Sequence, residues 1–106
     1  YYNQNGINLI DGSGTIDSTS LEKGVTLNLG TVYAKKNQGI AMRLNITPSD
    51  KSVQYGIITS YNKMRYVYGT GSCNHTFTIS ASDNYQIFIK NTSSKTVTIE
   101  GGYSVY

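Results

Sequence analysis

The chain has 106 residues, which is enough for one domain with a core of its own. Only 14% of the residues are charged, and the nine Lys and Arg residues are scattered, so the net charge of +3 gives no dense basic stripe for nucleic acid. No apolar run approaches the roughly 18 residues that a membrane span needs. Ten Tyr, eleven Gly, a single Pro and frequent Thr, Val and Ile favour strands. We therefore predict one β domain over residues 1–106, with neither nucleic-acid binding nor a membrane span.

Apolar side chains at every second residue predict the strands of the first half. A short run at Ile7 and Leu9 comes first, and a loop over residues 11–14 follows it. The next strand covers residues 25–34 with a kink at Gly30, where a residue without a side chain interrupts the pattern.

The cleanest alternation covers residues 40–46 and ends at Pro48, which lacks a ladder donor. Further strands are predicted over residues 53–58 and 64–68, before a Gly-rich stretch. The last part, residues 76–106, reads as a β-meander in which Gly101-Gly102 marks a bulge or a crossing between sheets. About eight short strands spaced near ten residues apart predict an all-β fold, an antiparallel β-sandwich with a jelly-roll-like arrangement. A small closed barrel is the main rival.

The meander carries a family resemblance. Phe77-Thr78-Ile79, the stretch 83–87, the turn 91–94 and the stretch 97–101 resemble the closing strands of secreted bacterial jelly-roll modules of the prepeptidase C-terminal type. The resemblance covers about a third of the chain, and Asn84 stands where that family has Gly before Tyr. The aspartates of that family's middle strands are also absent. The resemblance implies an accessory extracellular module and brings no catalytic residue with it.

Cys73 and His75 are the one pairing of a nucleophile with a base. Residues two apart on a strand share a face but lie about 6–7 Å apart, beyond the hydrogen-bond reach that such a pair needs. With a single Cys no disulfide within the chain is possible, and a buried thiol is the expectation. We therefore predict a protein that is not an enzyme.

Asp11, Asp17 and Glu22 have the spacing of oxygen ligands in a calcium loop, with Ser13 and Thr15 between them. The sixth position, usually Gly, is Ile16, and nothing nearby reads as a helix. The same residue types also make ordinary turns. The expectation is no cofactor, with calcium at these three carboxylates as the alternative.

The tyrosines divide by phase. The tyrosines that alternate in phase with the apolar residues of their strands are predicted to lie in the core, with their hydroxyls at its rim: Tyr55, Tyr66, Tyr68, Tyr85 and Tyr103. The out-of-phase Tyr33, Tyr61 and Tyr106 are the predicted ligand-binding residues, because exposed aromatic faces beside Asn and Gln donors suit a sugar ring. The absence of Trp argues against that ligand.

Asn45, Asn74 and Asn91 each head a glycosylation acceptor pattern, as chance allows in a chain rich in Asn, Ser and Thr. The chain begins without Met and without a signal peptide, as a mature or trimmed product would. Together with the low charge, this favours a protein that is secreted or lies at the cell surface.

The sequence thus predicts a non-catalytic secreted binding module that recognises carbohydrate or other cell-surface ligands. The alternative is a protein–protein or self-assembly module that uses an exposed strand edge, for which the nearly uncharged stretch 71–81 is the candidate.

Overall fold

The computed structural model describes residues 9–106, and this part of the chain consists of eight strands joined by turns. Nothing in it is a helix long and apolar enough to cross a membrane. The strands are β1 (Ser13–Leu21), β2 (Thr26–Ala34), β3 (Gly39–Thr47), β4 (Val53–Ile58), β5 (Met64–Gly69), β6 (Ser72–Thr78), β7 (Asp83–Asn91) and β8 (Val97–Val105).

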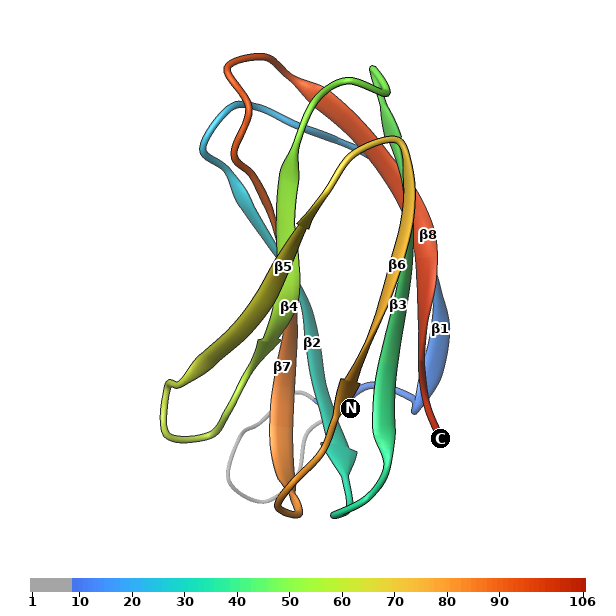
Figure 1. The fold of residues 1–106 in the computed structure, drawn as a ribbon, viewed down its shortest axis with the longest axis vertical. Helices are drawn as coiled ribbons and strands as arrows, with labels where there is room; N and C mark the ends of the chain where they lie inside the picture. Colours follow the sequence, from blue (N-terminus) through green and yellow to red (C-terminus); the bar gives the residue numbers. More distant parts are fainter. Residues whose placement is uncertain (1–8) are drawn as a thin grey trace.

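The strands form two four-stranded antiparallel sheets that face each other (Figure 1). One sheet has the order β1-β8-β3-β6 and the other β2-β7-β4-β5. Strands therefore pair first with last, second with seventh, third with sixth and fourth with fifth, as when one long hairpin wraps across both sheets. This is the all-β, eight-stranded antiparallel sandwich that the sequence predicted.

The core lies between the sheets, where alternate side chains of each strand point. On β3 the residues Ile40, Met42, Leu44 and Ile46 are buried, while Arg43 between them is exposed. The same alternation runs through the other long strands, since successive side chains point to opposite faces of a sheet. The core is aliphatic with a few rings: Ile16, Leu21, Val32, Ala34, Ile40, Met42, Leu44, Ile46, Val53, Tyr55, Ile57, Phe77, Ile79, Tyr85, Ile87, Ile89, Val97, Ile99 and Tyr103.

The first strand differs from the prediction. Residues 13–21 make β1, the edge strand beside β8, although the loop predicted over residues 11–14 included the first two of them. Leu9 of the predicted first run forms only an isolated parallel bridge with Thr31, and Ile7 lies outside the described residues. The alternation was missed because the inward positions of β1 include Thr19, and a bulge opposite Glu100 shifts the period.

Two glycine positions behave in different ways. The predicted kink at Gly30 is confirmed, since the β2–β7 register shifts between Asn28 and Gly30. The predicted crossing between sheets at Gly101-Gly102 is not found, because β8 runs continuously to Val105, and the bulge of the β1–β8 pair lies in β1, between Ile16 and Thr19. Gly101 instead has a φ of 156°, and a Cβ there would overlap the carbonyl oxygen of Arg43 on β3. Glycine is needed here for the close approach of β3 and β8.

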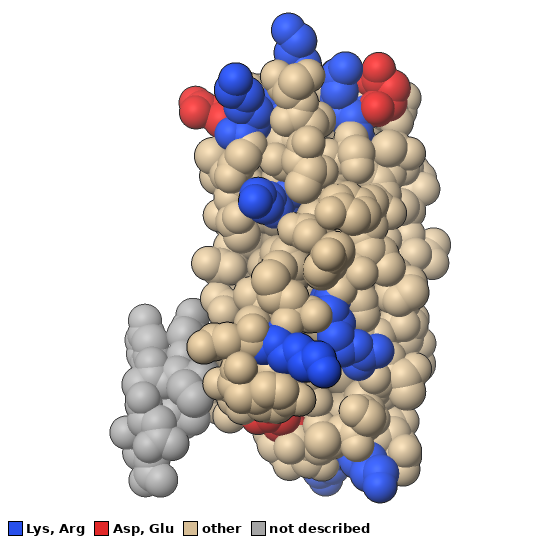
Figure 2. Space-filling model, turned by 60° about the vertical axis from the view of Figure 1, so that its left-hand side comes forward, with Lys and Arg blue, Asp and Glu red and all other residues tan. Residues whose placement is uncertain are grey.

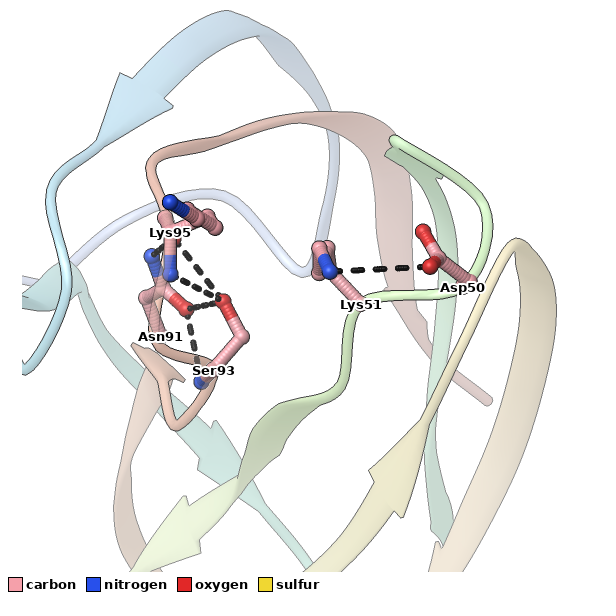
Figure 3. Close-up of polar contacts among 5 residues, drawn as sticks. All are labelled: Asp50, Lys51, Asn91, Ser93 and Lys95. Atoms are coloured by element: carbon pink, nitrogen blue, oxygen red, sulfur yellow. Dashed lines mark hydrogen bonds and ion pairs between the residues drawn. The ribbon is translucent and has the colours of Figure 1, made fainter.

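The side chain of Asn91, at the end of β7, is fully buried and satisfied (Figure 3). Its Nδ2 donates to the carbonyl oxygens of Leu21 at 2.9 Å and Lys95 at 2.7 Å. Its Oδ1 accepts from the amide and the hydroxyl of Ser93, at 2.9 and 2.7 Å. The backbone of Asn91 also bonds to Val25 and Gly24. One residue therefore fixes the ends of β1, β2 and β7 and the turn into β8.

Replacing Asn91 with Ala should destabilise the fold by about 3 kcal/mol, because the buried carbonyl of Leu21 loses its side-chain donor and the carbonyl of Lys95 loses one of its two. Equilibrium denaturant unfolding measures this change. Asn74→Ala on the exposed side of β6 is the matched control and should stay within about 0.5 kcal/mol of the native chain. A loss below about 1 kcal/mol at position 91 would contradict the role given to this side chain.

Candidate functional site

The β4–β5 hairpin stands out at one side of the sandwich and has a well-bonded turn (Figure 1). The Lys63 amide donates to the Thr59 hydroxyl at 2.9 Å, and the Thr59 amide donates to the Lys63 carbonyl at 2.9 Å. Asn62 takes a φ of 65°, a left-handed conformation that Asn tolerates better than most residues. The turn is therefore a defined platform for the side chains around it.

The register of β5 with β4 sets which of its side chains face solvent. Tyr55 is buried in the core and lies opposite Val67, so Val67 faces inward. The residues on either side, Tyr66 and Tyr68, then face outward, and they are 45% and 61% exposed. The prediction that these two tyrosines lie in the core is wrong, while the same prediction for Tyr55, Tyr85 and Tyr103 is confirmed.

Three rows of side chains cross the outer face of the β2-β7-β4-β5 sheet, since residues directly opposite on paired strands share a face. Lys90 is the one charged residue in these rows. The rows run Tyr68, Gln54, Lys90, Thr26; then Tyr66, Gly56, Phe88, Asn28; then Met64, Ile58, Gln86, Thr31.

The middle row has a glycine between two aromatic rings. A Cβ at Gly56 would overlap the carbonyl oxygen of Arg65, so only glycine fits there. Phe88 beside it is 1% exposed although it lies outside the core cluster, between the core residues Ile87 and Ile89. It is therefore buried on the outer face, where the bare position at Gly56 leaves room for neighbouring rings.

Met64, Tyr66 and Tyr68 of β5, with Tyr33 of β2, are exposed on this side of the molecule, and we call them the tyrosine face. The rings of Tyr66 and Tyr68 meet edge to face, with centroids 5.7 Å apart and planes at 83°. Figure 2 brings this side of the molecule forward and shows charged side chains at the upper end and again in the lower half, with an uncharged stretch between them. Exposed aromatic and Met side chains in such a stretch are typical of a binding surface.

An open hollow of about 480 Å³ lies beside the β4–β5 turn, and we call it the cationic hollow. It is lined by Thr59, Tyr61, Lys63, Arg65, Thr78, Ser80 and Tyr85. The Tyr85 hydroxyl donates to the Ala81 carbonyl at 2.6 Å, and burial raises the pKa of Tyr85. Two cations, two phenol rings and three hydroxyls therefore converge at one end of the sandwich.

Asp83 ties the turn to the start of β7. Its carboxylate accepts from the Ser60 hydroxyl at 2.8 Å and from the amides of Ser60 and Asn84 at 3.3 and 2.8 Å. Desolvation by itself raises the pKa of Asp83, but these three hydrogen bonds outweigh it and hold the pKa below its usual value.

The three predicted ligand-binding tyrosines are all exposed, but they lie on different parts of the molecule. Tyr33 belongs to the tyrosine face, and Tyr61 lines the cationic hollow. Tyr106 follows β8 and lies against Gly39 and Thr76, on the opposite sheet. Sequence reasoning missed Tyr66, Tyr68 and Met64, whose exposure follows from a register that the sequence does not display.

The carboxylates of the predicted calcium site are also spread out. Asp11 and Glu22 flank the two ends of β1, which in extended form separates them by roughly 30 Å. Asp17 points outward between them. Within residues 9–106 no group of three or more His, Cys, Asp or Glu side chains could hold a metal ion.

The surroundings of Cys73 favour the neutral form of its thiol. Cys73 is half-buried and free, and it hydrogen-bonds with the buried Tyr55 hydroxyl. Burial raises the pKa of Cys73, and the smaller effect of the hydrogen bond from Tyr55 lowers it only in part. The His75 ring packs edge-on against Phe77 at 4.6 Å. A nucleophilic Cys needs a lowered pKa, which is the opposite of what is found here.

No protein-family model matches the chain, and no curated protein matches its sequence. Among solved structures, the fold is similar to that of PliG from Aeromonas hydrophila, a periplasmic lysozyme inhibitor of g-type lysozyme. The TM-score is 0.63 at 16% identity, over 100% of this chain and 93% of that chain. A de novo designed double-stranded β-helix matches with a TM-score of 0.46 at 8% identity, over 84% of this chain and 95% of that chain. The similarity to PliG shows a shared fold.

The lowered pKa of Asp83 makes its contribution to stability depend on pH. That contribution is fully present above the pKa that the Asp83 carboxyl has in the unfolded chain. It is lost as the pH falls through the lower pKa that this carboxyl has in the folded protein. Asp83→Asn should therefore lower the Tm by about 2–4 °C at pH 7, and the difference should vanish in strong acid. Thermal melts of both proteins across this pH range measure it. Asp17→Asn on the exposed side of β1 is the control, and a Tm difference at position 83 that stays constant down to low pH would contradict the assignment.

Proposed function

We propose that this protein is a non-catalytic protein-binding module, and that it holds its partner on the tyrosine face at the β4–β5 hairpin. The observation that carries the proposal is the exposure of Met64, Tyr66 and Tyr68 on one edge strand, in rows where Lys90 is the one charged residue. Tyr and Met are enriched at the cores of protein interfaces, and charged residues are depleted there.

The edge position of β5 favours access by a large partner. The strand pairs with β4 on one side only, and the hairpin stands out from the sandwich (Figure 1). Because the strand fixes the backbone and the rings of Tyr66 and Tyr68 contact each other edge to face, a partner would meet two rings that already lie side by side. Such preorganisation lowers the entropy that binding must otherwise overcome.

The first partner class to test comes from the fold. PliG is an inhibitor of g-type lysozyme, and a shared fold makes an enzyme of that kind a reasonable first partner for this chain. A periplasmic, secreted or cell-surface location follows from the same reasoning and agrees with the low charge of the chain. An accessory role in a larger secreted protein, as in the prepeptidase C-terminal type, is a further proposal within the same class.

Carbohydrate recognition by the tyrosine face is the second candidate, since exposed phenol rings lie beside Gln54 and Gln86. The 83° angle between the Tyr66 and Tyr68 planes counts against one flat platform under a single sugar ring. Self-assembly is the third candidate. It is favoured by β6, an uncharged edge strand that lies within the stretch 71–81 and pairs with β3 alone.

Tyr66→Ala and Tyr68→Ala should each weaken binding to a g-type lysozyme by at least about tenfold, because truncating an interface tyrosine removes its buried area. Binding kinetics on the immobilised chain and inhibition of cell-wall lysis are the two measurements. Tyr106→Ala is the matched control, since Tyr106 is 66% exposed and lies on the opposite sheet.

The same samples separate the other candidates. Selective binding on a glycan array that Tyr66→Ala abolishes, without any lysozyme binding, would replace the proposal with carbohydrate recognition. Oligomers that grow with concentration in light scattering, unchanged by the tyrosine substitutions, would replace it with self-assembly through β6.

A further inference from the structure

We propose that the cationic hollow beside the tyrosine face is a subsite for a side-chain carboxylate from an acidic segment of a protein partner. This inference rests on the proposed protein-binding function and adds the chemistry of what is bound.

The hollow holds more positive charge than its surroundings neutralise. Lys63 and Arg65 both line it, and among residues 9–106 the one ion pair is Lys51 with Asp50, at the other end of the sandwich (Figure 3). Asp83 lies close by, but both its oxygens already accept hydrogen bonds from Ser60 and Asn84. Two cations against one occupied carboxylate leave the hollow with an excess of one positive charge.

Arg65 is held in a fixed position. Its Nη1 donates to the carbonyl oxygen of Thr78 at 2.5 Å, and its guanidinium carbon lies 5.9 Å from the centre of the Phe77 ring. A guanidinium has five N–H donors in a rigid plane, so this one contact leaves most of them for a ligand. A planar cation anchored in this way suits a carboxylate, which it can bind through two parallel hydrogen bonds.

Neutral donors surround the two cations. The phenol of Tyr61, which is 69% exposed, and the hydroxyls of Thr78 and Ser80 line the same hollow. The Thr59 hydroxyl is already an acceptor for the Lys63 amide, which fixes the backbone of the turn and leaves the Lys63 side chain outside it. Cations supported by hydroxyl donors favour an anion over a neutral sugar.

A peptide carboxylate fits better than a polyanionic chain. An anionic polysaccharide needs a row of cations at regular spacing, and Figure 2 shows the basic side chains in separate places rather than in a continuous track. Met64 and Tyr66 alternate along β5 with Arg65 and Val67, so the apolar face and the cationic hollow meet at one strand. An acidic side chain next to an apolar one is therefore the ligand that matches both.

The test uses a blocked pentapeptide with Glu at its second and fourth positions and, as its neutral counterpart, the same peptide with Gln. Amide NMR titration at low ionic strength should show shifts over residues 59–65 and 78–80, with binding at least about fivefold weaker for the Gln peptide. Raising the salt concentration should weaken binding of the Glu peptide and leave the affinity for the Gln peptide unchanged. Equal affinity of the two peptides, or shifts elsewhere, would overturn the proposal.

Two variants identify the cations. Lys63→Gln should weaken binding of the Glu peptide about threefold to tenfold, and Arg65→Gln should weaken it further. Since Arg65 also contacts Thr78 and Phe77, Lys63→Gln carries the test if Arg65→Gln fails to fold. Lys95→Gln, in the turn after β7 at the opposite end, makes the same charge change and should have no effect. An unchanged affinity in Lys63→Gln, or tighter binding of an oligogalacturonate at the same amides, would refute a peptide subsite.

The outcomes for the two proposals are distinguishable. If Tyr68→Ala abolishes binding of a protein partner while Lys63→Gln changes the affinity for neither that partner nor the Glu peptide, the binding face is retained and the subsite is removed. Binding of the Glu peptide that depends on Lys63, without any protein partner that depends on Tyr66 or Tyr68, would retain an acidic-ligand site and remove the proposed binding face.

Discussion

Gly56 is the position on which the exposed face of this protein depends. Its missing side chain lets the backbone of β5 pass close enough to β4 that a Cβ would overlap the Arg65 carbonyl. The register of the hairpin places Tyr55 opposite Val67 and turns Tyr66 to the outside, and the missing side chain at Gly56 leaves space beside Phe88 in the same row. Because side chains alternate along β5, the same register sends Arg65 to the cationic hollow. The register that Gly56 permits thus determines both surfaces of the hairpin.

The sequence predicted the sandwich well, because alternation of apolar residues reports directly on burial between two sheets. It assigned β3, β7 and β8 with little error. The predicted meander is wrong, because β7 lies in the opposite sheet from β6 and β8, so these consecutive strands do not pair with one another. It failed at β5, where Met64, Tyr66 and Tyr68 alternate as an inward face would. The phase of that strand depends on how residues 59–63 close the turn, and alternation within one strand holds no information about its register with the next. The candidate site was missed for this reason.

The two ends of the sandwich have different kinds of polar contact. At one end, the buried Asn91 side chain donates hydrogen bonds to carbonyls of two other segments. A movement of either segment would break one of these bonds and leave a polar group of Asn91 without a partner. At the other end, Ser60 and Asp83 hold the turn through exposed contacts that solvent can replace. A rigid end and an adaptable end suit a protein that presents a binding hairpin from a fixed scaffold.

Asn91 also heads an Asn-Thr-Ser acceptor pattern, and its burial gives that pattern an unusual meaning. The nitrogen to which a glycan would be attached is the one that donates to Leu21 and Lys95. Oligosaccharide transfer to this position and completion of the sandwich are therefore mutually exclusive. A eukaryotic secretory host would divide the newly made chains into bare molecules that fold and sugar-bearing molecules that do not. The choice of expression host therefore determines how much native protein is obtained.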